Sequence, residues 1–403
     1  MNILLTAFEC NPLLGSEAGL GWSWVYSAIK TAEIEKIWVV TTPKNKSVNN
    51  KEDIDEFLKT KEDAWNKVEF IYIDIPFYKA KINNRIRYIF WQKKIIKTIR
   101  DICEKNRVDY IHHVTWASMT LPTYLYRVKN TKIIYGPVGG GERISNVIKL
   151  QLTFKEKIIE YIRNTMFDLS KFSYSGNRMK YAAHCILVTT PETLKGVPKR
   201  YHKKCKIQQS IGVYREDLTS IHIERKQKET FVILMAARLL NWKGIQIGIR
   251  AVQKLLDEGI DVQLNIVGSG KYERKLKEMA KAYSQIQFVG NVTHRKMNQQ
   301  YDEADLFLNC SLHDSGGMVI LEAMSRAVPV MYINCGGPGE LAKGAGIPIQ
   351  PKSVDEMVDD IYLEISRLIK KPEFLQECGE KGLNRVREKF LNEDKYNNLI
   401  TFL

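Results

Sequence analysis

The sequence predicts an α/β protein made of two doubly wound domains. Short apolar runs alternate with longer amphipathic segments, which is the pattern of parallel sheets covered by helices. The alternation occurs in two successive series, separated by a polar stretch at residues 216–229. The 403 residues suffice for two domains of ordinary size. We therefore expect an N-terminal domain over residues 1–215, a C-terminal domain over 216–385 and a further helix over 386–403.

Each series predicts its own strands and helices. The first predicts strands at 3–7, 37–41, 68–72, 110–114, 132–135 and 185–189, and helices at 21–31, 85–106 and 155–165. The second predicts strands at 231–236, 263–267, 286–289, 306–309 and 330–332, and helices at 244–258, 271–283, 295–304 and 321–326. A long charged helical tract follows at 373–403. Ligands of open parallel sheets bind beyond the carboxyl ends of the strands, so the loops there are where a site is expected.

The composition indicates a globular protein of a reducing compartment. No run of about 18 uncharged apolar residues predicts a transmembrane helix, and the first residues lack the basic region and cleavage site of a signal peptide. The seven cysteines are scattered without a Cys-x-x-Cys pair, so no disulfide framework or cysteine zinc site is expected. The net charge of +15 favours anionic partners, but no nucleic-acid-binding motif accompanies it. We expect a cytoplasmic protein that does not bind nucleic acid.

The most informative motif is the segment 314–322, in which Asp314 and Glu322 bracket the pair Gly316-Gly317. Glycines let a ligand approach the backbone, and successive N–H groups at a helix start bind anions and hydroxyls. Each carboxylate can accept two hydroxyl hydrogen bonds, which suits a polyhydroxylated ligand. The structural alternative is that Glu322 begins the predicted helix merely as a charge favoured by the helix dipole.

Two cations stand five residues apart at a predicted strand-to-helix turn, Arg238 and Lys243. A guanidinium fork and an ammonium charge can together hold a diphosphate. The alternative is solvated surface charge, the usual fate of arginine and lysine. Gly290 follows the third strand of the same series.

Candidate residues of the first series also follow its strands. Gly15 and Ser16 begin a loop after the first strand that could cradle a phosphate or form a tight turn before the helix. His112 and His113 end the fourth strand, where alternation puts their rings on opposite faces and lets only one face a ligand. Such a histidine is more often structural than catalytic. The Asp-x-Asp pair at 53–55 is interpreted as solvated helix surface, so no metal site is expected.

The segment 79–100, from Lys79 to Arg100, holds eight basic residues and no acid, interleaved with Tyr88, Phe90 and Trp91. One interpretation is a core helix with a solvated basic face. The other is contact with an anionic membrane surface. The sequence leaves both open.

In the order of these motifs, the chain resembles the retaining glycosyltransferases of family 4, which are group 1 glycosyltransferases of GT-B fold. The matching residues are Arg238-Leu, Lys243-Gly and an acid-x7-Glu signature, with Asp314 where the family usually has glutamate. The resemblance covers nearly the whole chain and is strongest over residues 238–340. It implies two Rossmann-like domains with an interdomain cleft, and a C-terminal helix that crosses back to the first domain.

The resemblance also implies roles for these residues. The two cations would hold the donor's diphosphate, the second acid its ribose, and the first acid with the following backbone N–H groups the transferred sugar. The residues implied in donor binding are Arg238, Lys243, Gly290, Gly316, Gly317, Met318, Val319, Glu322, Gly15 and Ser16. Those implied in catalysis are Asp314, His112, His113, Arg238 and Lys243.

The implied reaction transfers a sugar with retention from a nucleoside-diphosphate sugar, expected to be UDP-linked, to a glycan or lipid-linked glycan in surface polysaccharide or glycoconjugate synthesis. The two cations would stabilise the leaving diphosphate in place of a metal ion, and no cofactor is expected. No enzyme nucleophile stands out, so the resemblance suggests a front-face route in which the leaving phosphate takes the acceptor proton. Two alternatives remain: a GT-B epimerase of nucleotide sugars, and a non-catalytic nucleotide-sugar-binding subunit of a glycan assembly.

Overall fold

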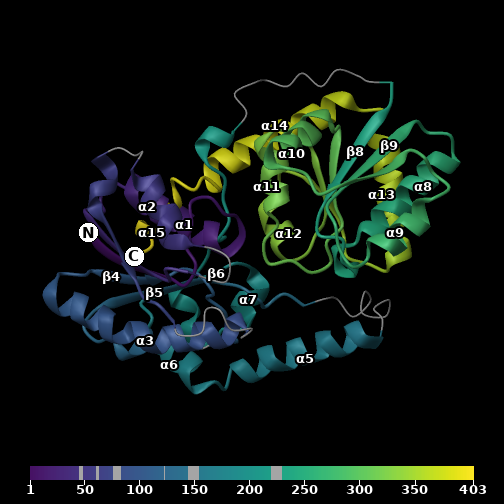
Figure 1. Ribbon diagram of the computed structural model, residues 1–403. Helices are drawn as coiled ribbons and strands as arrows, with labels where there is room; N and C mark the ends of the chain where they lie inside the picture. The colour runs from purple at the N-terminus through teal and green to yellow at the C-terminus, as the bar shows by residue number, and fades with distance from the viewer. Residues whose placement is uncertain (45–48, 60–62, 76–82, 122, 144–153, 219–228) are drawn as a thin grey trace. The chain divides into compact units, whose positions relative to one another are not determined.

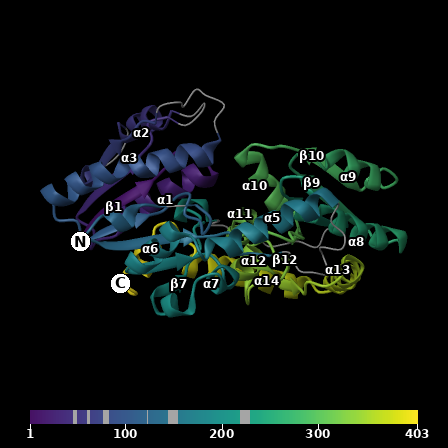
Figure 2. The ribbon, with the colours of Figure 1, turned by 90° about the horizontal axis from the view of Figure 1, so that it is seen from below.

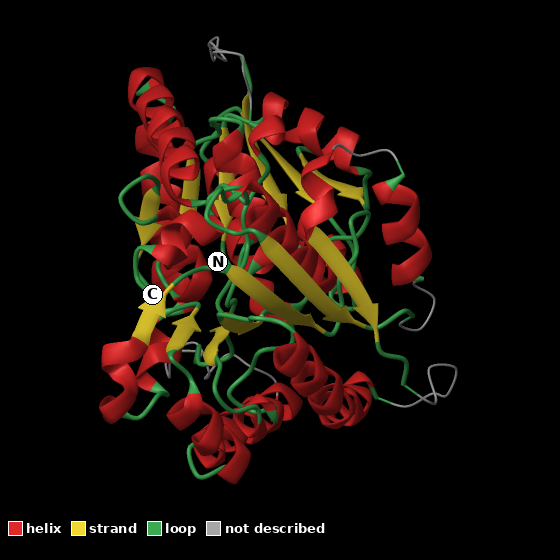
Figure 3. Cartoon of the chain, turned by 90° about the vertical axis from the view of Figure 1, so that its left-hand side faces the viewer, coloured by secondary structure: helices red, strands yellow, loops and turns green. Residues whose placement is uncertain are grey.

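The computed structural model describes residues 1–44, 49–59, 63–75, 83–121, 123–143, 154–218 and 229–403 (Figure 1). They form two compact units, each built on its own parallel sheet. Unit 1 comprises Met1–Gly141, Ile162–Gly212 and Asn392–Leu403, and unit 2 comprises Glu142–Tyr161 and Val213–Leu391. Helices and strands alternate along the chain in both, which confirms the predicted α/β class. Figure 3 colours the helices red and the strands yellow.

The sheet of unit 1 has seven parallel strands in the order β3-β2-β1-β4-β5-β6-β7. These are β1 Asn2–Ala7, β2 Lys36–Thr41, β3 Val68–Tyr72, β4 Tyr110–His113, β5 Lys132–Val138, β6 Cys185–Val188 and β7 Cys205–Ile207. The order reverses between β1 and β4, the point at which such sheets bind ligands. The sequence did not predict β7, because its three residues lie among lysines and form no apolar run.

Helices cover both faces of this sheet because successive side chains of each strand point to opposite sides. Leu4 of β1 packs into one hydrophobic core, and its neighbours Ile3 and Leu5 pack into another. The first core includes side chains of α3 Asn84–Lys105, α5 Phe154–Ser170 and α6 Tyr174–Ala182. The second includes side chains of α1 Ser16–Lys30, α2 Asn50–Leu58 and α15 Lys395–Ile400. Shorter elements are α7 Pro191–Lys195, η1 Asp63–Lys67, η2 Leu125–Arg127 and η3 Lys199–Lys204.

The sheet of unit 2 has six parallel strands in the order β10-β9-β8-β11-β12-β13. These are β8 Phe231–Ala236, β9 Val262–Val267, β10 Ile286–Gly290, β11 Leu306–Asn309, β12 Val330–Ile333 and β13 Ile347–Ile349. Its helices are α8 Ile245–Asp257, α9 Glu273–Ala280, α10 His294–Glu303, α11 Met318–Ser325, α12 Gly336–Ala342, α13 Val354–Leu368 and α14 Pro372–Lys389, with the turns η4 Arg215–Asp217 and η5 Asn241–Lys243. Here the order reverses between β8 and β11. The edge strand β13 contains Pro348 and was not predicted, since proline interrupts the strand pattern.

The helix after Gly317 begins earlier than the sequence predicts. Its cap is Gly317, at φ +133°, so α11 starts at Met318 and not at 321. Glu322 therefore lies in the second turn of α11. The alternative that Glu322 is a helix-start charge is wrong for this geometry.

The predicted C-terminal helical tract is interrupted. α14 ends at Lys389, and α15 begins only at Lys395. The helix is broken between them, because Leu391 forms a bridge with Val213 and the Val213 N–H donates to the Phe390 carbonyl at 3.0 Å. The prediction of a single helix over 386–403 is corrected accordingly. Residues Asn392–Leu403 belong to unit 1. The compact units divide at 141/142, 161/162, 212/213 and 391/392, while the predicted division into folding domains stays a prediction.

Two predicted features lie partly outside the described residues. These are Lys79 and Lys81 of the basic segment, and most of the connection at 216–229. Within the described ranges, no helix combines the length and the apolar character that crossing a bilayer would require.

Candidate functional site

A hollow of about 260 Å³ lies at the carboxyl ends of β8 and β11, where the strand order of unit 2 reverses. It brings together residues that the sequence predicts from two separate motifs: Arg238, Lys243, Asp314, Gly317, Met318 and Val319. The remaining lining residues were not predicted and are Met235, Ala236, Ala237, Ile245, Leu308, Asn309, Cys310 and Ser311. The hollow therefore forms at the position where open parallel sheets bind ligands.

The loop after β8 is held close to the end of β11. Gly244 adopts φ +69°, and a Cβ atom there would lie 2.0 Å from the Cys310 carbonyl oxygen. The N–H of Leu239 also donates to the Ser269 carbonyl at 2.8 Å. Glycine is thus required next to Lys243, and the loop has little room to move.

The two cations of the hollow differ in their partners. Lys243 forms an ion pair with Asp314, and both side chains are largely buried, at 15% and 22% exposure. The second oxygen of Asp314 accepts the Gly316 N–H at 3.3 Å. The Arg238 side chain is exposed and forms no hydrogen bond or ion pair with the described part of the chain. An anion entering the hollow thus meets one cation that a carboxylate holds and one that no other described residue binds.

Glycines also let the start of α12 pack against the Asp314 loop. A Cβ atom on Gly337 would lie 2.1 Å from the Gly316 carbonyl oxygen, and the Gly337 N–H donates to the Asp314 carbonyl at 2.8 Å. This contact fixes the chain that leads into α11. The first two residues of that helix, Met318 and Val319, then line the hollow.

Glu322 lies one helical turn beyond Met318 and does not line the hollow itself. Its carboxylate accepts a hydrogen bond of 2.8 Å from the hydroxyl of Tyr301, which is fully buried on α10. Burial raises the pKa of Glu322, and the Tyr301 hydrogen bond acts in the opposite direction. No motif in the sequence points to Tyr301, because it lies 21 residues away on another helix.

Gly290 ends β10, two strands from β8, and is not part of the hollow. Its φ of +79° is one that glycine adopts without strain, and its carbonyl accepts the Gly268 N–H at 2.8 Å. The structure shows a turn role for Gly290. Donor contact by this residue remains a prediction.

Gly15 and Ser16 lie in unit 1, at the carboxyl end of β1 beside the reversal of strand order. Both are exposed, and Ser16 has φ +57°, which is uncommon for a residue other than glycine. Two further residues at this edge, Glu17 and Trp116, were not predicted from the sequence. The Glu17 carboxylate accepts the Trp116 N–H at 3.1 Å, Trp116 also has φ +57°, and burial raises the pKa of Glu17. Left-handed non-glycine residues gather at functional sites, which is the signal that the structure adds.

His112 and His113 point to opposite faces of the sheet, as alternation predicts, but both rings are fully buried. His112 makes hydrogen bonds through Nδ1 with the Tyr396 hydroxyl at 2.7 Å and through Nε2 with the Gly136 carbonyl at 2.8 Å. Burial lowers its pKa to about 3. His112 therefore joins α15 to the sheet as a neutral ring.

His113 is enclosed in the same way on the other face. Its Nδ1 is 2.8 Å from the Thr6 hydroxyl oxygen, and its Nε2 is 2.8 Å from the Tyr88 hydroxyl oxygen. Burial lowers its pKa to about 4. The expectation that one of the two rings faces a ligand has no support in this geometry, because all four ring nitrogens are bonded inside unit 1.

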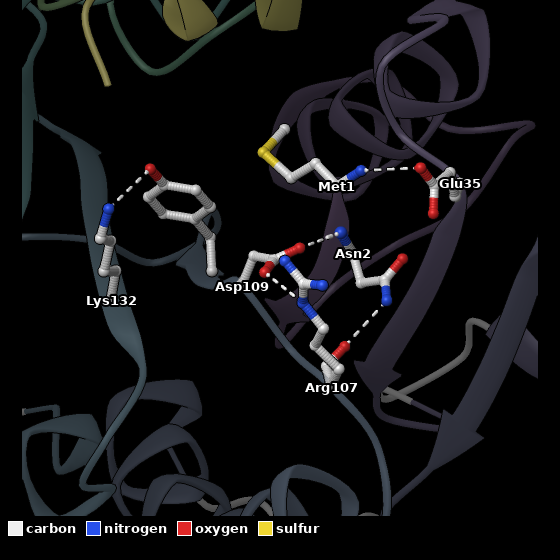
Figure 4. A pocket seen from close by; sticks show the side chains of 7 residues that line it. Met1, Asn2, Glu35, Arg107, Asp109 and Lys132 are labelled. Carbon is white, nitrogen blue, oxygen red and sulfur yellow. Dashed lines mark hydrogen bonds and ion pairs between the residues drawn. The ribbon is translucent and has the colours of Figure 1, made fainter.

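A second hollow, of about 440 Å³, opens at the amino ends of the strands in unit 1 (Figure 4). Its polar groups bond to one another: Asp109 accepts the Asn2 N–H at 2.8 Å and also pairs with Arg107. The N-terminal amine of Met1 is 3.4 Å from Glu35. These contacts tie strand ends together at the edge opposite to ligand sites, so the larger size does not make this hollow the candidate. Among the described residues, no group of three or more histidine, cysteine or acidic side chains could hold a metal ion.

The region that contains the hollow of unit 2 is similar in sequence to a known protein family. Residues 218–385 match the family model described as glycosyl transferases group 1. An uncharacterized glycosyltransferase of Haemophilus influenzae is 25% identical over 235 residues, which are 55% of this chain and 64% of that protein. The uncharacterized glycosyltransferase MJ1607 of Methanocaldococcus jannaschii is 30% identical over 52% of this chain and 48% of its own. A GDP-mannose-dependent phosphatidylinositol monomannoside mannosyltransferase of Corynebacterium glutamicum is 32% identical over 34% and 38%. The chain thus matches about half of the length of these curated relatives.

Solved structures resemble the whole chain. Sucrose-phosphate synthase from Thermosynechococcus elongatus has a TM-score of 0.66 at 16% identity, covering 99% of this chain and 97% of that one. HepE from Anabaena, solved with UDP and glucose, has a TM-score of 0.58 at 14% identity and covers 100% and 99%. At this identity the likeness shows the fold alone. The chain therefore has the GT-B fold of glycosyltransferases, and over residues 218–385 it is similar in sequence to the group 1 glycosyl transferases.

Proposed function

We propose that this protein is a retaining glycosyltransferase that transfers a sugar from a nucleoside-diphosphate sugar to a glycan or lipid-linked glycan. The observation that carries the proposal is the hollow of unit 2, in which Arg238, Lys243 and Asp314 meet at the reversal of strand order. Two cations and a carboxylate at that point suit a ligand with an anionic and a hydroxylated part.

The proposed binding mode assigns the diphosphate to the two cations. Arg238 would bind it through its planar fork, and Lys243 would contact it as a point charge. Asp314 would then lose part of its pairing with Lys243 and could accept hydroxyl hydrogen bonds from the sugar. Glu322, held by Tyr301, would accept bonds from the ribose.

The proposed chemistry is electrostatic. As the bond between the sugar and the diphosphate breaks, negative charge grows on the leaving oxygen, and Arg238 and Lys243 would stabilise it where a metal ion does so in other enzymes. No nucleophile is assigned to the protein, so the acceptor would attack from the side on which the diphosphate leaves. The leaving phosphate would take the acceptor proton, and retention follows from this front-face attack.

The donor is proposed to be UDP-linked. The solved relative HepE was crystallised with UDP and glucose, whereas a curated relative is named as GDP-mannose-dependent. The base is therefore the first variable that an experiment should change.

The acceptor is proposed to be met at the inner face of the membrane, through the basic segment that begins at Lys79. On α3 the exposed side chains include Lys93, Lys94 and Lys97, which supports attraction to an anionic surface. Tyr88 and Trp91 are buried in the core of unit 1 and cannot insert into lipid, so the sequence expectation for these two rings is corrected.

A panel of UDP-, GDP- and ADP-linked sugars tests the proposal, first by thermal stabilisation of the protein and then by turnover with and without glycan acceptors. We expect one donor class to stabilise the wild type and not the variant Arg238→Ala/Lys243→Ala. Conversion of the donor sugar without an acceptor would identify an epimerase instead. Stabilisation without turnover, even with extracted glycans present, would identify a binding subunit. If none of these nucleotides stabilises the wild type, the proposed function is wrong.

A further inference from the structure

Helix α5 turns apolar side chains toward solvent. Ile162, Met166 and Leu169 recur at three- to four-residue spacing along it, and each is between 44% and 62% exposed. A surface helix of a globular protein normally packs such a stripe against the core. The same helix, drawn as one long ribbon in Figures 1 and 2, also exposes Phe154, Ile158, Ile159 and Tyr161.

The stripe continues through the turn into α6. Phe172 in the turn is 81% exposed, and Tyr174 and Tyr181 on α6 are more than two-thirds exposed. We call the following six residues of unit 1 the α5–α6 apolar surface: Ile162, Met166, Leu169, Phe172, Tyr174 and Tyr181. Phe172, Tyr174 and Tyr181 line one hollow and so form one patch, and exposed apolar patches mark interaction sites.

Cations border this surface. Tyr174 and Tyr181 line a hollow of about 400 Å³ together with Arg178 of α6 and Tyr201 of η3. The Lys204 ammonium donates to the Tyr181 carbonyl at 2.9 Å, which fixes η3 against the end of α6. Between Glu192 and Glu216 the sequence has no acidic residue, and its basic residues are Lys195, Lys199, Arg200, Lys203, Lys204, Lys206 and Arg215.

The same face of the sheet carries α3. Phe167 of α5 and Met179 of α6 share a hydrophobic core with Trp91 and Ile95 of α3. The exposed lysines of α3 therefore belong to the same side of unit 1 as the α5–α6 apolar surface. This side combines apolar area with cations from three elements.

Three kinds of partner could cover such a surface. A glycan could stack on the tyrosine rings, but it leaves the aliphatic Ile162, Met166 and Leu169 without a role. A second copy of this chain could cover the apolar area, but it would place like charges against one another. An anionic bilayer satisfies both features, because aromatic and aliphatic side chains enter its interface while cations meet the lipid phosphates.

We propose that the α5–α6 apolar surface inserts shallowly into an anionic lipid bilayer, with Arg178 and the cations of η3 on the lipid phosphates. The inference deepens the proposed function, since a lipid-linked acceptor would be met at this surface. It assigns the apolar part of the contact to α5 and α6, because the rings on α3 other than that of Phe90 are buried. It does not depend on a donor, so it can fail or succeed separately.

Vesicle flotation of the full-length chain tests it, without nucleotide. One set of vesicles is phosphatidylcholine, and the other is equal parts of phosphatidylcholine and phosphatidylglycerol. We expect binding to the anionic vesicles that salt weakens. The variant Leu169→Ser/Phe172→Ser/Tyr174→Ser should bind about tenfold more weakly, because it loses the inserting side chains. The matched control is Leu363→Ser on α13, an equally exposed leucine of unit 2, which should bind like the wild type.

A second variant tests the cations. Lys199→Gln/Arg200→Gln/Lys203→Gln changes exposed residues of η3 and should weaken binding and flatten its salt dependence. The inference is overturned if wild type binds neither vesicle, or if the serine variant binds as wild type does. It is also overturned if light scattering shows a wild-type dimer that the serine variant abolishes while vesicle binding is absent. Loss of nucleotide stabilisation with vesicle binding intact would instead contradict the proposed function alone.

Discussion

Lys243 and Asp314 come from motifs 71 residues apart, and the structure joins them as an ion pair. The sequence predicted a separate role for each, on the diphosphate and on the sugar. It could not predict the pairing, because the contact depends on β8 and β11 being neighbours in the sheet. A diphosphate that attracts Lys243 would free Asp314 for the sugar, so the two roles are coupled at the level of single residues.

Asp314→Asn and Glu322→Gln should affect different steps. Glu322→Gln should mainly weaken binding of the nucleotide, since Glu322 is assigned to the ribose. Asp314→Asn should mainly lower turnover, and it should not weaken binding of the bare nucleoside diphosphate, because Lys243 then loses a competing anion. Calorimetric titration of UDP into both variants decides this. If Asp314→Asn reduces the affinity more than Glu322→Gln does, the two roles are assigned wrongly.

Tyr301→Phe should weaken nucleotide binding by about 1 kcal/mol, because it removes the hydroxyl that holds the Glu322 carboxylate. Burial raises the pKa of Glu322 and this hydrogen bond lowers it, so the variant should raise that pKa further. The pH below which nucleotide affinity falls should therefore move upward. The control is Tyr283→Phe, which removes a similar hydroxyl from the surface residue Asp257. Identical pH profiles for both variants would show that Tyr301 does not act on Glu322.

Among the secondary-structure elements, the strands that form apolar runs were predictable, whereas the two shortest strands and the exact ends of some helices were not. β7 and β13 are three residues each and give no periodic signal. The start of α11 depends on the left-handed geometry at Gly317, which local propensity does not reveal. The break between α14 and α15 depends on a bridge to Val213, a contact made far away in the sequence.

Gly244→Ala should destabilise the protein more than Gly259→Ala does. Both glycines have left-handed φ angles, +69° and +74°, and alanine costs about 1–2 kcal/mol in that region. Only at Gly244 would the new Cβ atom meet a backbone oxygen, that of Cys310. Urea unfolding should show the larger loss for Gly244→Ala, and nucleotide affinity should fall only in this variant, because its loop carries Lys243. Equal losses in both variants would contradict the close approach.

For the molecule as a whole, the two-sheet architecture was predictable because both apolar series are long and regular. Which side chains of the helices face solvent was not predictable. The basic segment at 79–100 suggested inserting rings, but Tyr88 and Trp91 face the core. The helix predicted at 155–165 gave no indication that its apolar stripe faces solvent, because periodicity shows that a helix has two faces and not which one the protein covers.

The protein should lose stability as the pH falls from about 6.5 toward 4. His112 and His113 have folded-state pKa values of about 3 and about 4, below the ordinary value of 6.5. In this window the unfolded state binds protons that the folded state excludes. The stabilisation that the two neutral histidines contribute is therefore complete above pH 6.5 and is lost on acidification. Each fully linked proton contributes about 1.4 kcal/mol per pH unit. Urea unfolding at a series of pH values should give a shallower slope for His113→Gln than for wild type, and equal slopes would refute the linkage.

The central claim is that the hollow of unit 2 binds a diphosphate through Arg238 and Lys243. Calorimetric titration of UDP and uridine into wild type, Arg238→Ala and Lys243→Ala tests it most directly. Wild type should bind UDP at least about tenfold more tightly than uridine. Each substitution should weaken UDP binding by about 1.5–3 kcal/mol while leaving uridine binding unchanged. Arg250→Ala, which removes a surface cation of α8, is the matched control and should bind UDP normally. Equal affinity for UDP and uridine in wild type, or normal UDP binding in both variants, would contradict the claim.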